Sequence, residues 1–210
     1  MAVKVFKGEV TSDGFPEDEM NACINAGNHE HLVKLIGKIK NHPERKMGLV
    51  LELIPPSYKN LAGPPSFDTC TRDTFKEGTH FSSESISKIT YAVADAAMHL
   101  HSKGVMHGDL YAHNTLFDEN ANAIFGDFGA ATIYDNSAAN ASLLEKIDVR
   151  AFGCLIEDLL NHNHEQTNPL KDSLIRLKED CMQEEISKRP SFEMICNHLY
   201  LLSLPTMQRK

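Results

Sequence analysis

Apolar residues follow two spacings along this chain. Short apolar runs bounded by turn-forming residues predict strands, and apolar residues that recur every three or four positions predict helices. Strands are expected at Met1–Phe6, Leu32–Ile39, Met47–Leu53, Thr115–Phe117 and Ala123–Phe125. Helices are expected at Pro16–Ala26, Ser83–Ser102, Asp148–Leu160, Pro169–Met182 and Ser191–Leu202, with a further short one at Phe67–Lys76. The polar stretch 130–145 is rich in small residues and predicts a mobile loop.

Two of these strands, Thr115–Phe117 and Ala123–Phe125, flank a polar turn and predict a β-hairpin. Asp109 and Asn114 precede the first strand of the hairpin, and Asp127 follows the second. Because a hairpin brings its outer ends together, the three side chains are expected at the same end. Two carboxylates and a carboxamide suit an oxygen-liganded Mg²⁺ and a proton acceptor for a hydroxyl group.

The composition is typical of a globular intracellular protein. The chain has 210 residues, 41% hydrophobic and 24% charged, which fits one domain or one domain in two lobes. A net charge of −8 argues against nucleic-acid and anionic-membrane partners, although Mg²⁺ can bridge acids to phosphates. No apolar run approaches the ~20 residues of a membrane span, and the N-terminus has no signal-peptide pattern. The five cysteines form no C-x-x-C pair and are typical of reduced thiols, so a cytoplasmic location is expected.

The stretch from His107 to Gly129 resembles the catalytic and metal-binding loops of the eukaryotic-type protein kinases. It contains H-G-D-L-x-x-x-N and D-F-G, where the family has H-R-D-L-x-x-x-N and D-F-G. The resemblance implies that Asp109 is the catalytic base, that Asn114 and Asp127 bind Mg²⁺, and that ATP is the phosphate donor. The alternative is that both acids are ordinary turn residues.

The N-terminal strand carries a second likeness. Its A-V-K is similar to the kinase strand V-A-I-K, which implies that Lys4 holds the ATP α/β-phosphates and that Ala2 lines the adenine pocket. Kinases pair this lysine with a helix glutamate, for which Glu19 is the first candidate and Glu17 the second. The alternatives are that Lys4 is a solvated edge charge and that the acids only cap their helix.

Glu52-Leu53-Ile54 precedes two prolines and resembles the kinase hinge, whose backbone groups bind adenine. The resemblance implies cofactor contacts from Glu52 and Ile54. It places Leu51 at the back of the pocket and makes Leu116 a further cofactor contact.

Two later motifs resemble structural parts of the family. Residues 148–153 read D-V-R-A-F-G, similar to the kinase D-V-W-S-F-G, whose aspartate bonds the backbone of the catalytic loop. Asp148 would therefore support the site, and the alternative is a helix N-cap. Lys188-Arg189-Pro190-Ser191 resembles the late R-P-[ST] motif with its ion-paired arginine, and Glu145 is the candidate partner of Arg189.

The motifs follow the family's order from Met1 to about Leu202. The resemblance implies one protein kinase domain over residues 1–210 with a two-lobed α+β fold. A truncated antiparallel-sheet lobe would occupy residues 1–54 and a mostly helical lobe residues 55–210. It further implies ATP-dependent transfer to a hydroxyl of a protein substrate, with Ser/Thr favoured by frequency, and leaves the oligomeric state open.

The chain departs from the family pattern in four places. No glycine-rich loop precedes Lys4, so its strand is expected at an exposed edge, and a fragment or a late start is expected. Gly108 replaces the usual arginine, which implies no control by loop phosphorylation. Segment 129–148 lacks A-P-E. Tyr111 stands where Ser/Thr kinases carry a lysine, and His113 is not the tyrosine-kinase arginine, which leaves the hydroxyl preference open.

Two other functions compete with a protein kinase. H-G-D-L-x-x-x-N is also similar to aminoglycoside and choline kinases, which suggests a small-molecule phosphotransferase. The missing phosphate cover suggests a non-catalytic scaffold. A third pattern, H-x-H at His162 and His164, has no further ligands nearby in the sequence and is a weak metal signature.

Overall fold

The computed structural model describes residues 1–6, 10, 14–66 and 72–203. Its strands are β1 (Ala2–Val5), β2 (Leu35–Lys38), β3 (Gly48–Leu51), β4 (Lys59–Asn60), β5 (Val105–Met106), β6 (Thr115–Phe117), β7 (Ala123–Phe125) and β8 (Thr132–Ile133). Its helices are α1 (Pro16–Ala26), α2 (Ser83–Ser102), α3 (Ala141–Asn161), α4 (Pro169–Cys181) and α5 (Phe192–Ser203), with short 3₁₀ turns η1 (Ala112–Asn114) and η2 (Ile186–Lys188). The expected α+β fold is confirmed.

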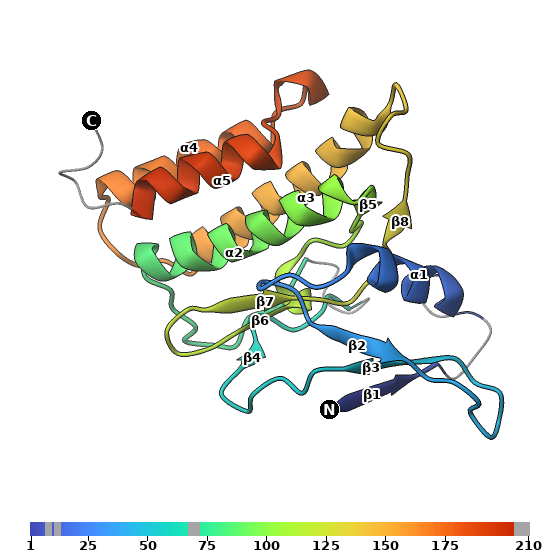
Figure 1. The fold of residues 1–210 in the computed structure, drawn as a ribbon. Helices are drawn as coiled ribbons and strands as arrows, with labels where there is room; N and C mark the ends of the chain where they lie inside the picture. Colours follow the sequence, from blue (N-terminus) through green and yellow to red (C-terminus); the bar gives the residue numbers. More distant parts are fainter. Residues whose placement is uncertain (7–9, 11–13, 67–71, 204–210) are drawn as a thin grey trace.

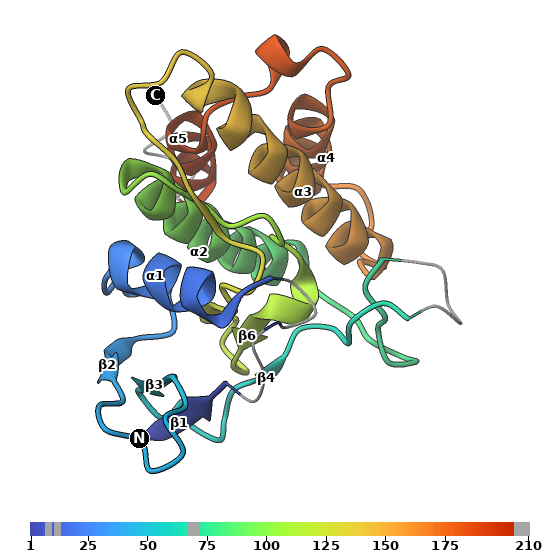
Figure 2. The same ribbon diagram turned by 90° about the vertical axis from the view of Figure 1, so that its right-hand side faces the viewer.

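The first sheet is antiparallel, with strand order β1-β3-β2. Lys4 of β1 lies opposite Leu49 of β3, and Ala2 lies opposite Leu51. Strand β1 is therefore an edge strand among the described residues, as the sequence predicted. Figures 1 and 2 show this sheet at one end of the molecule, helices α2–α5 at the other, and α1 between them.

The helical part is built around α2, which packs against α5 and α3. Its apolar positions recur at helical spacing, and Ile86, Ile89, Val93 and Leu100 are fully buried. The Ser82 hydroxyl accepts the backbone N–H of Ser85 and caps the helix start. The predicted hairpin is also present, because β6 pairs with β7 in register Thr115–Phe125 to Phe117–Ala123.

Two sequence predictions about the chain after the hairpin are wrong. The stretch 130–145 is not one loop, because Thr132–Ile133 pairs with β5 and α3 begins at Ala141. Asp148 therefore lies inside the helix rather than capping it. The start was missed because it carries no strong signal: Asn140 precedes the helix but makes no side-chain cap hydrogen bond.

The short helix expected at Phe67–Lys76 is not formed in its described portion. Residues 67–71 lie outside the described residues, and Thr74 forms an isolated antiparallel bridge with Gly63. The frayed end expected at Pro205–Lys210 also lies outside them. In the described ranges, every helix falls short of the length or the apolarity that a membrane span needs.

Candidate active site

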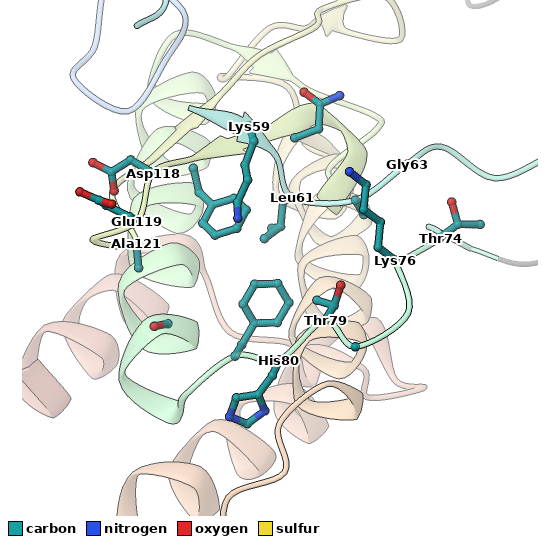
Figure 3. Close-up of a pocket in the computed structure, with 16 residues that line it drawn as sticks. Lys59, Leu61, Gly63, Thr74, Lys76, Thr79, His80, Asp118, Glu119 and Ala121 are labelled. Carbon is teal, nitrogen blue, oxygen red and sulfur yellow. The ribbon is translucent and has the colours of Figure 1, made fainter. Parts of the chain in front are cut away.

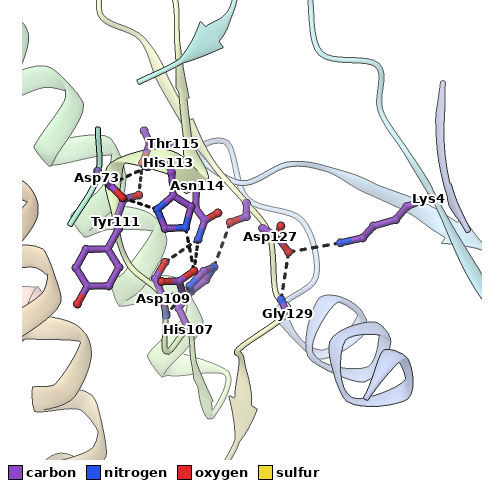
Figure 4. A network of polar contacts seen from close by, with 11 residues as sticks. Lys4, Asp73, His107, Asp109, Tyr111, His113, Asn114, Thr115, Asp127 and Gly129 are labelled. Atoms are coloured by element: carbon purple, nitrogen blue, oxygen red, sulfur yellow. Dashed lines mark hydrogen bonds and ion pairs between the residues drawn. The ribbon is translucent and has the colours of Figure 1, made fainter. Parts of the chain in front are cut away.

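Asp109 lies in the loop between β5 and η1, and two side chains of η1 hold its carboxylate. The Asn114 Nδ2 donates to Asp109 Oδ2 at 2.8 Å and to its backbone oxygen at 2.9 Å. The His113 Nε2 lies 3.1 Å from the same Oδ2 (Figure 4). Burial raises the pKa of Asp109, but the hydrogen bonds from His113 and Asn114 outweigh it and hold the pKa below its ordinary value. Asp109 is therefore an oriented carboxylate at neutral pH.

His107 ties this loop to the end of the hairpin. Its buried ring packs on Phe125 and Phe128, with centroids 4.3 and 5.4 Å away. Its Nε2 lies 3.2 Å from the Gly126 carbonyl oxygen, while its Nδ1 accepts the backbone N–H of Asp109 at 3.3 Å. Burial lowers the pKa of His107, which favours the neutral ring that these bonds need. The segments bearing the two acids therefore share one small core.

Asp148 braces the loop from behind. Its buried carboxylate, on α3, accepts the backbone N–H groups of His107 at 2.8 Å and Gly108 at 2.9 Å. It also lies 2.9 Å from the His101 Nε2. Burial raises the pKa of Asp148, but the hydrogen bond from His101 and the neighbouring charges lower it by more, so the pKa lies below its ordinary value. The predicted supporting role of Asp148 is the one its contacts describe.

Gly108, at the position of the family's arginine, has a backbone conformation that a side chain cannot easily adopt. Its φ is +78°, in the left-handed region that favours glycine. A Cβ there would lie 2.6 Å from the Ala130 carbonyl oxygen. The glycine is thus a steric requirement of this loop.

Asp127 begins the turn after β7 with φ of +61°, a conformation that aspartate tolerates better than most residues. Its Oδ1 accepts the Gly129 N–H at 3.3 Å and lies 3.4 Å from the Lys4 Nζ (Figure 4). Its side chain is 54% exposed, so most of it faces solvent rather than protein.

Lys4 reaches this point from the edge strand and is held by Glu19 of α1. The Lys4 Nζ donates to Glu19 Oε1 at 2.5 Å, and the Glu19 side chain is only 6% exposed. Burial lowers the pKa of Lys4, yet the hydrogen bond that Lys4 donates to Glu19 and the charge of Asp127 outweigh it, so the pKa lies above its ordinary value. The first candidate, Glu19 rather than Glu17, is therefore the acid that contacts Lys4.

Most of the predicted cofactor residues line one of two cavities, whereas Ala2 and Leu116 line neither. Leu51 lines a cavity of about 50 Å³ together with Lys4, Glu19 and Asp127, and Ala2 lies opposite Leu51 on the sheet. Glu52 and Ile54 line a neighbouring cavity of about 360 Å³. The backbone N–H of Glu52 donates a hydrogen bond to the Lys34 carbonyl oxygen at 2.9 Å.

Leu116 lies on β6 opposite Ile124, half-buried, and lines neither of these two cavities. A larger hollow of about 710 Å³ lies elsewhere, between β4, the hairpin turn and the start of α2 (Figure 3). Lys59, Phe81 and Asp118 are among its lining residues, and it contains none of the predicted site residues.

Sequence reasoning missed Asp73, which contacts the catalytic loop from a distant segment. Its Oδ1 lies 2.6 Å from the His113 Nδ1, and its Oδ2 accepts the His113 backbone N–H at 3.0 Å. Hydrogen bonds with Asp109 and Asp73 raise the pKa of His113 to about 10. His113 was noted only as a departure from the family, and nothing in the sequence around Asp73 links it to this loop.

The structure corrects one predicted ion pair and agrees with the weak weight given to the H-x-H pattern. Arg189 donates to the backbone oxygens of Gln183 and Lys146, at 2.9 and 3.0 Å, and the expected partner Glu145 instead accepts the Tyr134 hydroxyl at 3.1 Å. The Arg189–Glu145 pairing is therefore wrong. The rings of His162 and His164 pack separately, on Phe75 and His80. They do not converge as an H-x-H metal site would require.

Comparison with known proteins gives one family match. The model described as "Protein kinase domain" matches residues 1–151. A probable serine/threonine-protein kinase of Arabidopsis thaliana is 31% identical over 106 residues, which cover 50% of this chain and 13% of that protein.

Receptor kinases are also similar to this chain. The tyrosine-protein kinase receptor TYRO3 of Gallus gallus is 25% identical over 71% of this chain and 17% of its own length. Fibroblast growth factor receptor 1 of Pleurodeles waltl is 24% identical over 95% of this chain and 30% of its own length. The chain thus spans less than a third of each of these relatives.

Proposed function

This chain belongs to the protein kinase family, and from that premise we propose that it transfers the γ-phosphoryl group of ATP to a hydroxyl of a protein. The observation that carries the proposal is the meeting of three distant segments at one place. Lys4 from the edge strand contacts Asp127, while the neighbouring loop presents Asp109. Ser/Thr is the favoured acceptor, on base rate alone, and a cytoplasmic location accompanies the proposal.

Asp109 is the proposed base. The acceptor hydroxyl oxygen attacks the γ-phosphorus, the bond from that phosphorus to the β–γ bridging oxygen breaks, and ADP leaves with the bond's electrons. The hydroxyl proton passes to the Asp109 carboxylate. Because the transition state of phosphoryl transfer is loose, positioning the hydroxyl matters more than strong basicity. A carboxylate with a lowered pKa is compatible with this role.

The donor set of the site fits Mg²⁺, a hard cation that prefers oxygen ligands. Asp127 offers an exposed carboxylate, and Asn114 offers an amide oxygen because its Nδ2 is engaged with Asp109. These two residues are the proposed ligands. When bound, Mg²⁺ would neutralise phosphate charge. Lys4, oriented by Glu19, would add a fixed positive charge at the α/β-phosphates.

Adenine is proposed to lie between apolar side chains of Ala2, Leu51 and Leu116. Backbone groups of the hinge at Glu52 and Ile54 would bind its edge. The Glu52 N–H already donates to the Lys34 carbonyl, so the Glu52 carbonyl is the group proposed to face adenine.

A thermal-shift titration with Mg-ATP tests nucleotide binding. At 100 times its dissociation constant, the nucleotide should add ~2.7 kcal/mol to the free energy of unfolding. The Asp127→Asn variant should lose most of this gain. Asp95→Asn is the matched control, because the Asp95 carboxylate also lies near side-chain nitrogens, those of His29 and His31, but lies outside the site. A flat response in the parent chain would favour a non-catalytic scaffold.

A transfer assay then tests the acceptor class. The parent chain is incubated with labelled ATP and a degenerate peptide library carrying Ser, Thr or Tyr at its centre, beside a panel of small hydroxylated acceptors. Transfer to peptides, abolished by Asp109→Asn, is the expected result. Turnover of small acceptors alone would replace the protein kinase with a small-molecule phosphotransferase.

A further inference from the structure

Among the described residues, the hydrogen bonds of the Asp109 side chain fall on one of its carboxylate oxygens. Both His113 and Asn114 approach Oδ2, at 3.1 and 2.8 Å. Among the contacts of the described residues, none reaches Oδ1, and the Asp109 side chain is 34% exposed. The carboxylate is thus clamped by one oxygen and presents the other outward.

The His113 ring is itself held from its far side. Asp73 binds both the ring Nδ1, at 2.6 Å, and the backbone N–H of His113, at 3.0 Å. This double contact sets the ring position as well as the backbone position. The Asp73 side chain is 2% exposed and the His113 side chain 17%, so solvent competes little with these bonds.

Asp73 is anchored in turn by the residue before it. The Arg72 guanidinium contacts Glu157 of α3 at 2.5 Å and Asp158 of the same helix at 3.4 Å. The segment of Arg72 and Asp73 is thereby tied to α3 next to the point where Asp73 contacts His113. The result is a continuous path of contacts from α3 to Asp109.

We infer that Asp73 and His113 are positioning residues that orient Asp109 so that its Oδ1 faces the acceptor hydroxyl. The inference rests on the proposed function, since it assigns a role within that reaction. His113 touches neither substrate nor phosphate in this account. It acts by holding Oδ2, since one ring nitrogen lies 3.1 Å from Asp109 Oδ2 and the other 2.6 Å from Asp73 Oδ1. A base misplaced by about 1 Å can cost about 100-fold in rate.

Two substitutions of one histidine separate the contacts. The amide nitrogen of Gln stands near the position of Nε2, so His113→Gln can still donate to Asp109. Asn is shorter and matches Nδ1, so His113→Asn can reach Asp73 but not Asp109. Transfer from labelled ATP to the degenerate Ser/Thr/Tyr peptide library is the readout, with kcat and the KM for ATP measured separately.

We expect His113→Asn to lower kcat by about 10–100-fold with little change in the KM for ATP, and His113→Gln to retain most of kcat. Asp73→Asn should lower kcat in the same way. The double variant His113→Asn/Asp73→Asn should be no slower than His113→Asn alone, because both changes break one path. A purely structural role would instead lower the apparent kcat only in proportion to the folded fraction. The kcat of the molecules that remain folded would be unchanged.

The outcomes distinguish this inference from the proposed function. If the parent chain transfers phosphate and all three single variants keep its kcat when folded, the inference is overturned and the kinase assignment stands. Additive effects of Asp73→Asn and His113→Asn would also overturn it. If the parent chain transfers nothing, the proposed function fails first. Unfolding midpoints measured on each variant identify any that fail to fold, and Asp73→Asn then decides.

Discussion

Asp109 and Lys4 occupy opposite sides of the candidate site, and their surroundings differ in burial and in support. The loop of Asp109 is braced by the buried groups of His107 and Asp148 and by the contact of Asp73 with His113. Lys4 stands on an edge strand, 41% exposed, with one short contact to Glu19 and a longer one to Asp127. The Asp109 side of the site is therefore supported by buried groups, whereas the Lys4 side lies on a partly exposed edge strand.

Substitutions on the two sides should therefore have different effects, on stability at one side and on nucleotide binding at the other. Substitutions at the residues that support the Asp109 loop, such as Asp148, remove buried hydrogen bonds and should lower the free energy of unfolding. Changes at Lys4 remove a charge that is 41% exposed, so they should cost less stability and act mainly on the nucleotide, although its partner Glu19 is only 6% exposed. Unfolding measurements therefore separate support from chemistry.

The largest expected effect is at Asp148. Asp148→Ala leaves the N–H groups of His107 and Gly108 and the ring of His101 without their buried acceptor. The free energy of unfolding should fall by about 3–5 kcal/mol, measured by urea denaturation. Asp180→Ala, an exposed position on α4, is the control and should be near neutral. Equal losses at both positions would remove the contrast drawn above.

A smaller loss is expected at Gly108. Gly108 and Gly78 have nearly the same φ, +78° and +76°, but a Cβ meets the Ala130 carbonyl oxygen at 2.6 Å only in the first case. Gly108→Ala should therefore cost about 1–3 kcal/mol more than Gly78→Ala in the same urea assay. Identical losses would mean that the loop yields, and would open this position to the arginine of the family.

The pH dependence of stability tests the contacts of the His113 ring with Asp73 and Asp109. The pKa of His113 is raised to about 10 from 6.5, so its stabilising contribution is complete below about pH 6.5 and is lost as the pH rises towards 10. The difference in unfolding free energy between the parent chain and His113→Gln should shrink over that window. A difference that is constant from pH 6 to 10 would contradict the charged ring.

The smallest effect on stability is expected at Lys4. Lys4→Met should lower the free energy of unfolding by about 1 kcal/mol, because the lysine is 41% exposed although its partner Glu19 is only 6% exposed. The same variant should lose the Mg-ATP stabilisation in the thermal-shift titration, whereas Lys38→Met, on the far edge of the same sheet, should keep it. A large loss of stability at Lys4 would make the two sides of the site alike.

Local patterns in the sequence predicted the elements and most of the site. Short apolar runs found β1 and the hairpin, and helical spacing found α2, because each of these signals depends only on a short segment of the chain. The spacing of Asp109, Asn114 and Asp127 around the hairpin found the acids, since a hairpin joins its own ends. Glu19 was chosen over Glu17 from the resemblance to the kinase lysine–glutamate pair, and its contact with Lys4 agrees with that choice.

Other features depend on contacts between segments that are remote in the sequence. The requirement for glycine at position 108 comes from a carbonyl at Ala130, and the backbone partners of Arg189 come from two separate turns. Asp73 meets His113 across 40 positions. The sequence alone determined which chemical groups this protein carries and which short elements hold them. Only the tertiary structure decided which oxygen of Asp109 is clamped and which is presented, because that choice depends on packing between loops that no local pattern encodes.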